Sequence, residues 1–131
     1  MIRHTATKSR PSADIPWYDP ELQDAWQLAS QNQVDVGMIN VDIQLSEDGL
    51  TYTITCDYEN LESCILSQKD VVSNELRDSQ RAYRENAGIR LVTEPWEDTV
   101  TGEQYTESDM IAKEEEMRAA GKLTAHRYMR T

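Results

Sequence analysis

The chain has 131 residues, enough for one hydrophobic core but not for two. Its formal net charge of −11 argues against non-specific binding to nucleic acid or to an anionic membrane, because both need positive charge. No segment is long and apolar enough to cross a bilayer, and the N-terminus lacks the apolar part of a signal peptide. We therefore expect a protein made in the cytoplasm, with no membrane partner.

Residues 2–8 (IRHTATK) are short and rich in Thr and predict a first strand at the edge of a sheet, although their alternation is weak. Residues 9–20 contain three prolines and predict an extended loop. Asp19-Pro20 is typical of a helix start, with an N-cap followed by proline at the first helical position. We expect this helix to end near Asn32.

Asp48-Gly49 lies between two alternating runs and predicts a hairpin with a two-residue type I′ turn. That turn makes Glu47 face Leu50 and fixes every later pair in strands over about 39–46 and 51–59. The alternate pairs are apolar and polar, so a one-residue slip would mix the faces. We expect one buried face and one wet face. The apolar pairs are Leu45–Tyr52, Ile43–Ile54, Val41–Cys56 and Ile39–Tyr58.

Asn60 is a candidate cap for the next helix, and Asp70 for a fresh one, so a break near residues 68–70 is expected. The second helical stripe ends at Ala87-Gly88, and residues 89–94 predict a strand. The order is then strand, helix, hairpin, helix, strand. It favours an α+β, ferredoxin-like β-α-β-β-α-β fold over residues 1–94, with helices on one face of an antiparallel sheet.

Residues 95–131 are predicted to form an acidic C-terminal extension. Residues 95–105 predict a small hairpin or an irregular excursion. A helix over about 107–120 is expected to start at Thr106 or Ser108, and its narrow apolar stripe suits a helix on a surface. A last strand or terminal arm follows.

No catalytic or metal-binding pattern is present in the sequence. His4 and His126 have no ligand spacing, and Cys56 and Cys64 do not form a C-x-x-C pair. We expect both thiols to be reduced and packed in the core. Glu114–Glu116 point about 100° apart on a helix and cannot converge on one ion. The prediction is a non-enzymatic protein without metal or cofactor.

Aromatic residues beside prolines are the candidate interface residues. Trp17, Tyr18 and Trp96 lie on proline-stiffened loops, where they either anchor a partner or fold back to close the core. The C-terminal Arg127, Tyr128 and Met129 raise the same question.

Three segments, IRHTATKSRPSADIPWY, LSEDGLTYTITCDYENLES and RAYRENAGI, carry a resemblance to a known group. They resemble small proteins of tailed bacteriophages, closest to those of T4-like phages of marine bacteria. The resemblance covers about residues 1–92 and rests on residues that determine the fold. It implies a virion structural protein, made in the host cytoplasm and bound to other virion proteins. Residues 95–131 depart from the pattern.

Three functions remain open from the sequence. The first is a non-enzymatic minor structural protein that docks on a tail, neck or capsid surface through the loop aromatics and terminal arms, with a homo-oligomer in the particle as one arrangement. The second is an acidic regulator that binds a host protein, in one form by imitating nucleic acid. The third is a small dimeric ferredoxin-like enzyme, which only the fold supports.

Overall fold

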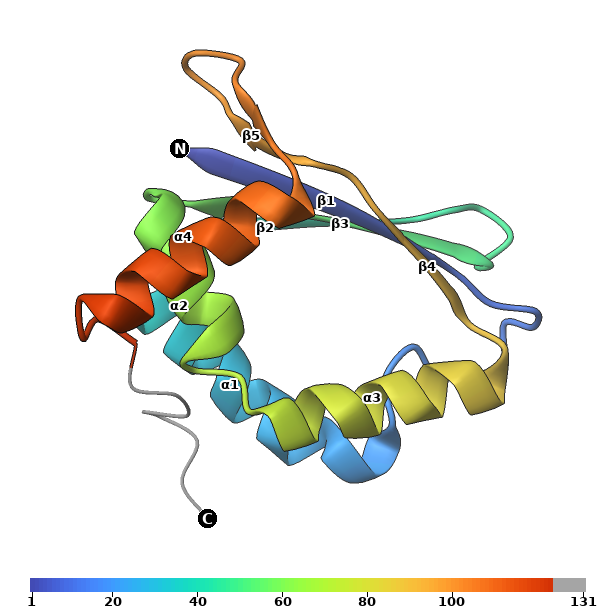
Figure 1. Cartoon of the computed structure of the whole chain (residues 1–131). Coiled ribbons are helices and arrows are strands. Elements are labelled where there is room, and N and C mark those ends of the chain that lie inside the picture. Colours follow the sequence, from blue (N-terminus) through green and yellow to red (C-terminus); the bar gives the residue numbers. More distant parts are fainter. Residues whose placement is uncertain (124–131) are drawn as a thin grey trace.

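The computed structural model describes residues 1–123 as a twisted antiparallel sheet with helices on one face (Figure 1). The core of the topology is β1 (Ile2–Ser9), α1 (Gln23–Asp35), β2 (Met38–Leu45), β3 (Thr51–Tyr58), α2 (Leu61–Lys69), α3 (Asn74–Ala87) and β4 (Arg90–Thr93). A short hairpin of β5 (Trp96–Asp98) and β6 (Gln104–Tyr105) and the helix α4 (Glu107–Ala119) follow. No helix among the described residues has the length and hydropathy needed to span a bilayer.

The sheet has the order β2-β3-β1-β5-β6, and β4 also pairs with β1. Both β4 and β5 lie along the same edge of β1, where they act as one strand interrupted at residues 94–95. This arrangement confirms the predicted β-α-β-β-α-β order. The prediction that residues 2–8 form an edge strand is wrong, because β1 is hydrogen-bonded on both sides and lies in the middle of the sheet.

Helix boundaries follow the predicted caps with two corrections. Asp19 caps the short 3-10 helix η1 (Pro20–Leu22), which leads into α1, and α1 ends at Asp35 rather than near Asn32. The predicted break separates α2 from α3. However, the N-cap of α3 is Ser73, whose Oγ accepts the Leu76 N–H at 3.0 Å, whereas Asp70 is the C-cap of α2.

The β2–β3 hairpin keeps the predicted register from Leu45–Tyr52 to Asn40–Asp57. The last pair differs, because a bulge at Ile39 places Met38 opposite Tyr58. The turn is also longer than predicted. Ser46 N–H bonds to the Thr51 carbonyl and Gly49 N–H to the Ser46 carbonyl, so four residues form the loop. Asp48 holds it by accepting hydrogen bonds from Ser46 Oγ and Leu50 N–H.

The apolar row of β2 is exposed, which corrects the expectation of a fully buried hairpin face. Tyr52 on β3 is buried, but Ile43 on the neighbouring strand is 54 % exposed. The reason is position, since β2 is the outermost strand and its apolar side chains lie at the open rim beside α1. The same holds for Ile39, Val41 and Leu45.

Buried apolar residues form two separate clusters. The first joins one end of the sheet to α2 and α4, and includes Ile2, Tyr58, Ile65 and Met117. The second contains Ala29, Val71, Val72 and Leu76, which all come from α1, α3 and the link before α3. Within the described residues, no strand contributes to the second cluster. The half of the sheet that faces α1 and α3 is therefore not closed by a continuous apolar core.

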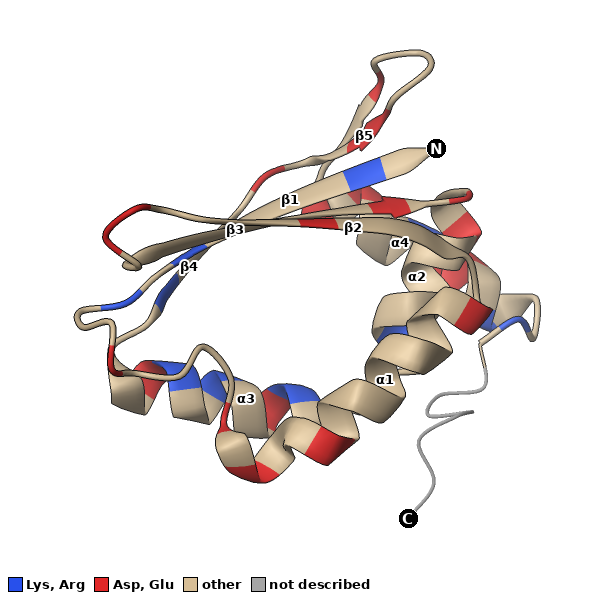
Figure 2. Cartoon of the chain, turned by 180° about the vertical axis from the view of Figure 1, so that it is seen from behind, with Lys and Arg blue, Asp and Glu red and all other residues tan. Residues whose placement is uncertain are grey.

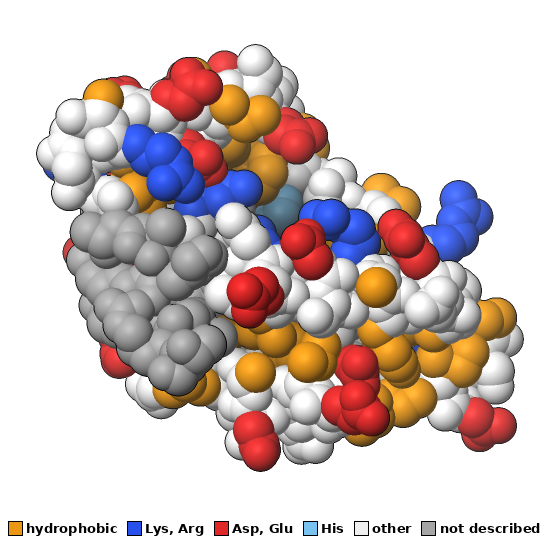
Figure 3. Space-filling view, turned by 60° about the horizontal axis from the view of Figure 1, so that its bottom comes forward, with side chains coloured by type: hydrophobic (Ala, Val, Ile, Leu, Met, Phe, Trp, Pro, Cys, Tyr) orange, Lys and Arg blue, Asp and Glu red, His pale blue; other side chains and the backbone are white. Residues whose placement is uncertain are grey.

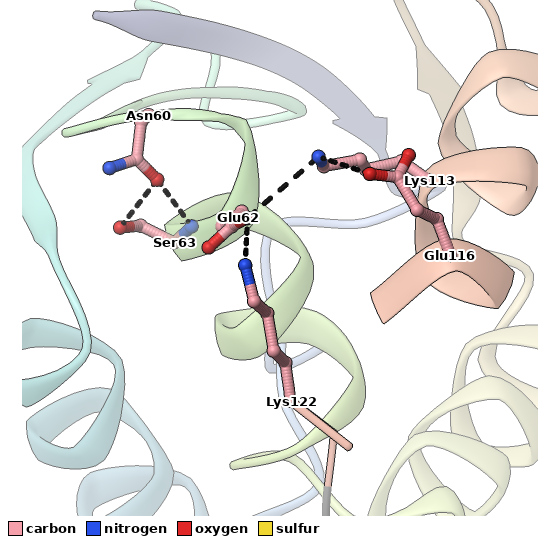
Figure 4. Close-up of polar contacts among 6 residues, drawn as sticks. All are labelled: Asn60, Glu62, Ser63, Lys113, Glu116 and Lys122. Carbon is pink, nitrogen blue, oxygen red and sulfur yellow. Dashed lines mark hydrogen bonds and ion pairs between the residues drawn. The ribbon is translucent and has the colours of Figure 1, made fainter. Parts of the chain in front are cut away.

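The C-terminal helix is tied to the rest of the molecule by its packing and by ion pairs. Met110 and Met117 of α4 belong to the first cluster, and Thr106 caps the helix as predicted. Glu62 of α2 pairs with Lys122 at 2.9 Å and with Lys113 at 3.8 Å (Figure 4). The predicted helix over 107–120 is confirmed, and residues 95–105 form the hairpin. The proposed boundary at residue 94 remains a prediction.

Candidate ligand cavity between sheet and helices

A cavity of about 630 Å³ opens between α3 and the strands β1, β4 and β5. We call it the arginine cavity, because its wall carries Arg77, Arg81 and Arg84 of α3. Its volume lies within the range of about 300–1,000 Å³ typical of small-molecule sites. Figure 3 shows basic side chains and a histidine side chain (pale blue) together in a hollow of this face. A cavity of this size beside three arginines is the main feature of the fold that its packing does not explain.

Helical spacing places the three arginines together. Positions 77, 81 and 84 are separated by four and three residues, so the side chains lie on one face of α3. Figure 2 shows these basic positions along α3 (blue). Arg81 pairs with Asp78 at 3.2 Å, while burial lowers the pKa of both Arg77 and Arg84. Glu94 and Glu107 also line the cavity, so its wall is cationic only on the α3 side.

Three residues that line this cavity each carry a buried nitrogen without a hydrogen-bond partner within residues 1–123. These nitrogens are His4 Nε2, Trp26 Nε1 and Arg77 Nε. A buried polar group without a partner costs about 1–3 kcal/mol, and native structures keep such groups rare. The Nε1 of Trp96 is another buried nitrogen without a hydrogen-bond partner within residues 1–123. It has Cys64 as a neighbour, whose sulfur is a weak acceptor, and this contact lowers the thiol pKa against the larger effect of burial.

His4 and Trp96 form a flat aromatic wall. Their ring centroids are 4.2 Å apart and the ring planes differ by 9°. Burial lowers the pKa of His4, although a backbone hydrogen bond with Glu94 acts in the opposite direction. His4 is therefore neutral at pH 7. A stacked pair of this kind offers an apolar surface to a ligand and adds no charge of its own.

A second cavity of about 780 Å³ lies on the other side of Trp26, between α1 and the strands β2 and β3. We call it the apolar cavity. Its wall includes Val34, Met38, Val41, Ile43 and Ile54, and Asp19 is the one charged residue that residues 1–123 contribute to it. The exposed apolar row of β2 therefore forms part of this wall.

The predicted interface residues Trp17 and Tyr18 are partly buried and make contacts within the chain. Trp17 lies 5.3 Å from Tyr52, ring to ring, and the Arg10 guanidinium lies 4.3 Å above the Trp17 ring. The ring centroids of Tyr18 and Trp26 are 5.6 Å apart. Of the two alternatives that the sequence left open, this is the arrangement in which the loop folds back over the sheet.

Trp96 also folds inward, onto His4, and lines the arginine cavity. Arg127, Tyr128 and Met129 lie outside the described residues. The structure brings Trp17 and Tyr18 together with Lys8, Trp26 and Tyr52. Trp96 is not in this group and lies in the wall of the arginine cavity. Their role in binding a partner remains a prediction.

The cysteines lie on the sheet and α2 rather than in a reactive setting. Burial raises the pKa of the Cys64 thiol to about 12, and it also raises the pKa of Cys56. Both thiols are therefore protonated at neutral pH and poor nucleophiles. Within residues 1–123, no three His, Cys, Asp or Glu side chains are grouped as ligands for a metal ion.

Sequence reasoning missed the three arginines of α3 as candidate ligands. Their four- and three-residue spacing was the available signal. The spacing is equally typical of a solvated helix face, and only the cavity opposite it gives the arrangement meaning.

Comparisons with known proteins support the fold alone. No protein-family model and no curated protein matches this sequence. A dimeric ferredoxin-like protein from an uncultured marine organism aligns with a TM-score of 0.58 and 10 % identity, over 77 % of this chain and 96 % of that chain. Rv0793 from Mycobacterium tuberculosis aligns over 77 % of this chain and 100 % of that chain, with 12 % identity and a TM-score of 0.36.

The protein is therefore an α+β protein with the ferredoxin-like fold. Its particular features are the incomplete core under the sheet and two cavities that occupy this space.

Proposed function

We propose that this protein binds a small organic anion in the arginine cavity. The observation that carries the proposal is the cavity of about 630 Å³ with Arg77, Arg81 and Arg84 together on one wall. A guanidinium binds a carboxylate or phosphate through two parallel hydrogen bonds, and such bonds are stronger than neutral ones. An anion bound by the Arg77 guanidinium would offset the cost of burying this cation, which also lowers its pKa.

The walls favour an organic ligand over a free inorganic ion. The stacked His4–Trp96 pair and Trp26 present aromatic surface to the same cavity as the arginines. Small-molecule sites combine such apolar walls with a few polar groups that fix orientation. Glu94 and Glu107 oppose a highly charged ligand, so a single anionic group on an apolar body suits the cavity best.

Titration calorimetry with benzoate tests this proposal. We expect saturable binding to the wild-type protein and a loss of affinity of about 10- to 100-fold in Arg77→Gln, because one hydrogen bond to a charged group contributes about 1.5–3 kcal/mol. Arg118→Gln is the matched control, since Arg118 lies on α4 and pairs with Glu114 outside both cavities. Equal affinity in wild type and Arg77→Gln would overturn the proposal.

A second proposal retains the role that the phage resemblance implies, a non-enzymatic virion component that docks on a neighbouring virion protein. The structural observation in its favour is the outer edge of β2. This strand has no partner on one side within the described residues and exposes Ile39, Ile43 and Leu45. Exposed edges of this kind pair with other chains unless charges protect them.

Mass spectrometry of density-purified particles, compared with infected lysate, tests the virion role. A fixed ratio to known tail, neck or capsid proteins is expected, and Ile43→Lys should remove the protein from particles. Absence from particles despite abundance in the lysate would contradict the virion role. Light scattering of the purified chain separates docking from self-association, which the description of the structural neighbour as dimeric makes worth measuring.

A further inference from the structure

The arginine cavity and the apolar cavity are neighbours that share two wall residues. Trp26 and Gln33, both on α1, line the two cavities. The first cavity opens between α3 and β4, and the second between α1 and β2. The Trp26 side chain thus borders both cavities, and the two cavities adjoin at this residue.

The absence of a sheet contribution to the second core cluster, within residues 1–123, explains why two cavities adjoin under the sheet. Ala29, Val71, Val72 and Leu76 pack among helices, and the strands above them contribute no residue to that cluster. Dry protein interiors are normally close-packed, with few voids larger than a water molecule. The two spaces under this sheet are instead open to solvent, and they share Trp26 and Gln33 in their walls.

The arginine cavity and the apolar cavity differ in charge. Over the described residues, the arginine cavity has three cations on one wall, whereas the apolar cavity has no cation and carries Asp19. The wall of the apolar cavity combines the aliphatic side chains of Val34, Val41, Ile43 and Ile54 with uncharged polar residues of α1, which are Gln23, Gln27, Ser30, Gln31 and Gln33. An anion is attracted to the first cavity and repelled from the second, while an alkyl chain gains by leaving water in the second.

We propose that one amphipathic ligand occupies both cavities, with its anionic head at the arginines of α3 and an unbranched alkyl tail that passes Trp26 into the apolar cavity. This rests on the proposed binding of an organic anion and specifies its class. The head is a carboxylate or a phosphate, since a guanidinium fork matches both. The tail replaces water against the exposed apolar row of β2.

A chain-length series tests the tail. Calorimetry with butyrate, hexanoate, octanoate and decanoate, below their micelle concentrations, should show affinity rising roughly fourfold per methylene, the value for complete burial of each added group. Decyl phosphate identifies the preferred head by comparison with decanoate. Decanol, which lacks the charge, should bind more weakly than decanoate.

Two pairs of variants assign the two ends. Arg77→Gln should weaken decanoate at least tenfold and leave decanol unchanged. Val41→Asp places a carboxylate in the apolar cavity and should weaken decanoate at least tenfold while benzoate binding stays the same. The controls are Arg118→Gln and Val100→Asp, because Val100 is 83 % exposed on the β5–β6 loop. Circular dichroism and the unchanged benzoate affinity show that Val41→Asp is folded.

The results separate this inference from the proposed function. Benzoate binding that depends on Arg77, together with an affinity that does not change from butyrate to decanoate, would overturn the amphipathic ligand and leave the anion site intact. Binding of decanol that is as tight as decanoate would also overturn it. A failure of every anion to bind would overturn both proposals.

Discussion

Lys8 of β1 is buried, and its ammonium lies against two aromatic rings. Its ammonium lies 4.0 Å above the Tyr18 ring and 5.9 Å from the Tyr52 ring, and 6 % of the residue is exposed. Burial lowers the pKa of Lys8 to about 8, and the nearby positive charge of Arg84 acts in the same direction. The cation–π contact favours the charged form and opposes this shift.

The lowered pKa of Lys8 predicts how stability depends on pH. Between about pH 8 and 9.5 the unfolded chain, with its ordinary lysine pKa, binds more protons than the folded one, so stability rises with pH. Urea unfolding at both pH values should show a free energy of unfolding that rises with pH in wild type and does not rise in Lys8→Met. Lys69→Met is the control, since the Lys69 side chain is 40 % exposed on α2. A rise of the same size in Lys8→Met would show that another group causes it.

At the residue scale, the sequence indicated which side chains are aromatic or charged but not which of them meet. Trp17 and Tyr18 were predicted correctly to lie in a loop between prolines. Their contacts with Tyr52 and Trp26 involve residues from β3 and α1, and no local pattern encodes such distant pairings. The arginine cavity was not predictable for the same reason, because its wall combines residues from helices and strands that are far apart in the sequence.

The connection between α1 and β2 depends on Gly37. Its φ is +110°, and a β-carbon there would lie 2.6 Å from Ser63 Oγ on α2. The Gly37 carbonyl also accepts the Glu59 N–H at 2.9 Å. The close approach of α2 to this turn therefore requires a residue without a side chain.

Gly37→Ala should destabilise the protein by roughly 2–4 kcal/mol, through backbone strain and the contact with Ser63. Gly102→Ala is the matched control. Gly102 also has a positive φ, +77°, but a β-carbon at this position would have no described atom within 4 Å, so only about 1–2 kcal/mol is expected. Chemical denaturation measures both. Equal losses would show that the contact with Ser63 carries no cost.

The hairpin shows what was predictable at the level of elements. Its register followed from alternating apolar and polar pairs, because a slip of one residue would reverse every side chain. The bulge at Ile39 was not predictable, since Met38 and Ile39 are both apolar and either can pair with Tyr58. The exposure of the β2 row was missed because alternation identifies a face but does not show whether a helix covers it.

The whole molecule is held together by the first core cluster, which includes residues from both ends of the described chain. Ile2 and Met117 belong to it together. The narrow apolar stripe of residues 107–119 predicted a surface helix, and the stripe is narrow because its two methionines are the residues that enter the core. Ile111 of the same helix is half exposed.

Met117→Ala should therefore destabilise the entire protein, by about 2–5 kcal/mol, the usual cost of truncating a buried methionine. Ile111→Ala should cost less than about 1 kcal/mol, because its side chain is already in contact with water. Unfolding followed by both tryptophan fluorescence and far-UV circular dichroism should give one transition in each variant. An early, separate loss of helix signal in Met117→Ala would favour the predicted boundary at residue 94.

The central place of β1 constrains how the chain folds. This strand pairs on one side with β3, about fifty residues later in the chain, and on the other with β4 and β5, which follow some ninety residues behind it. Such distant pairings delay folding, because the loops between them must close first. During synthesis one edge of β1 thus stays open until β3 is made and the other until β4 and β5 are made, and its threonines, lysine and arginine help to keep it from pairing with other chains in the meantime.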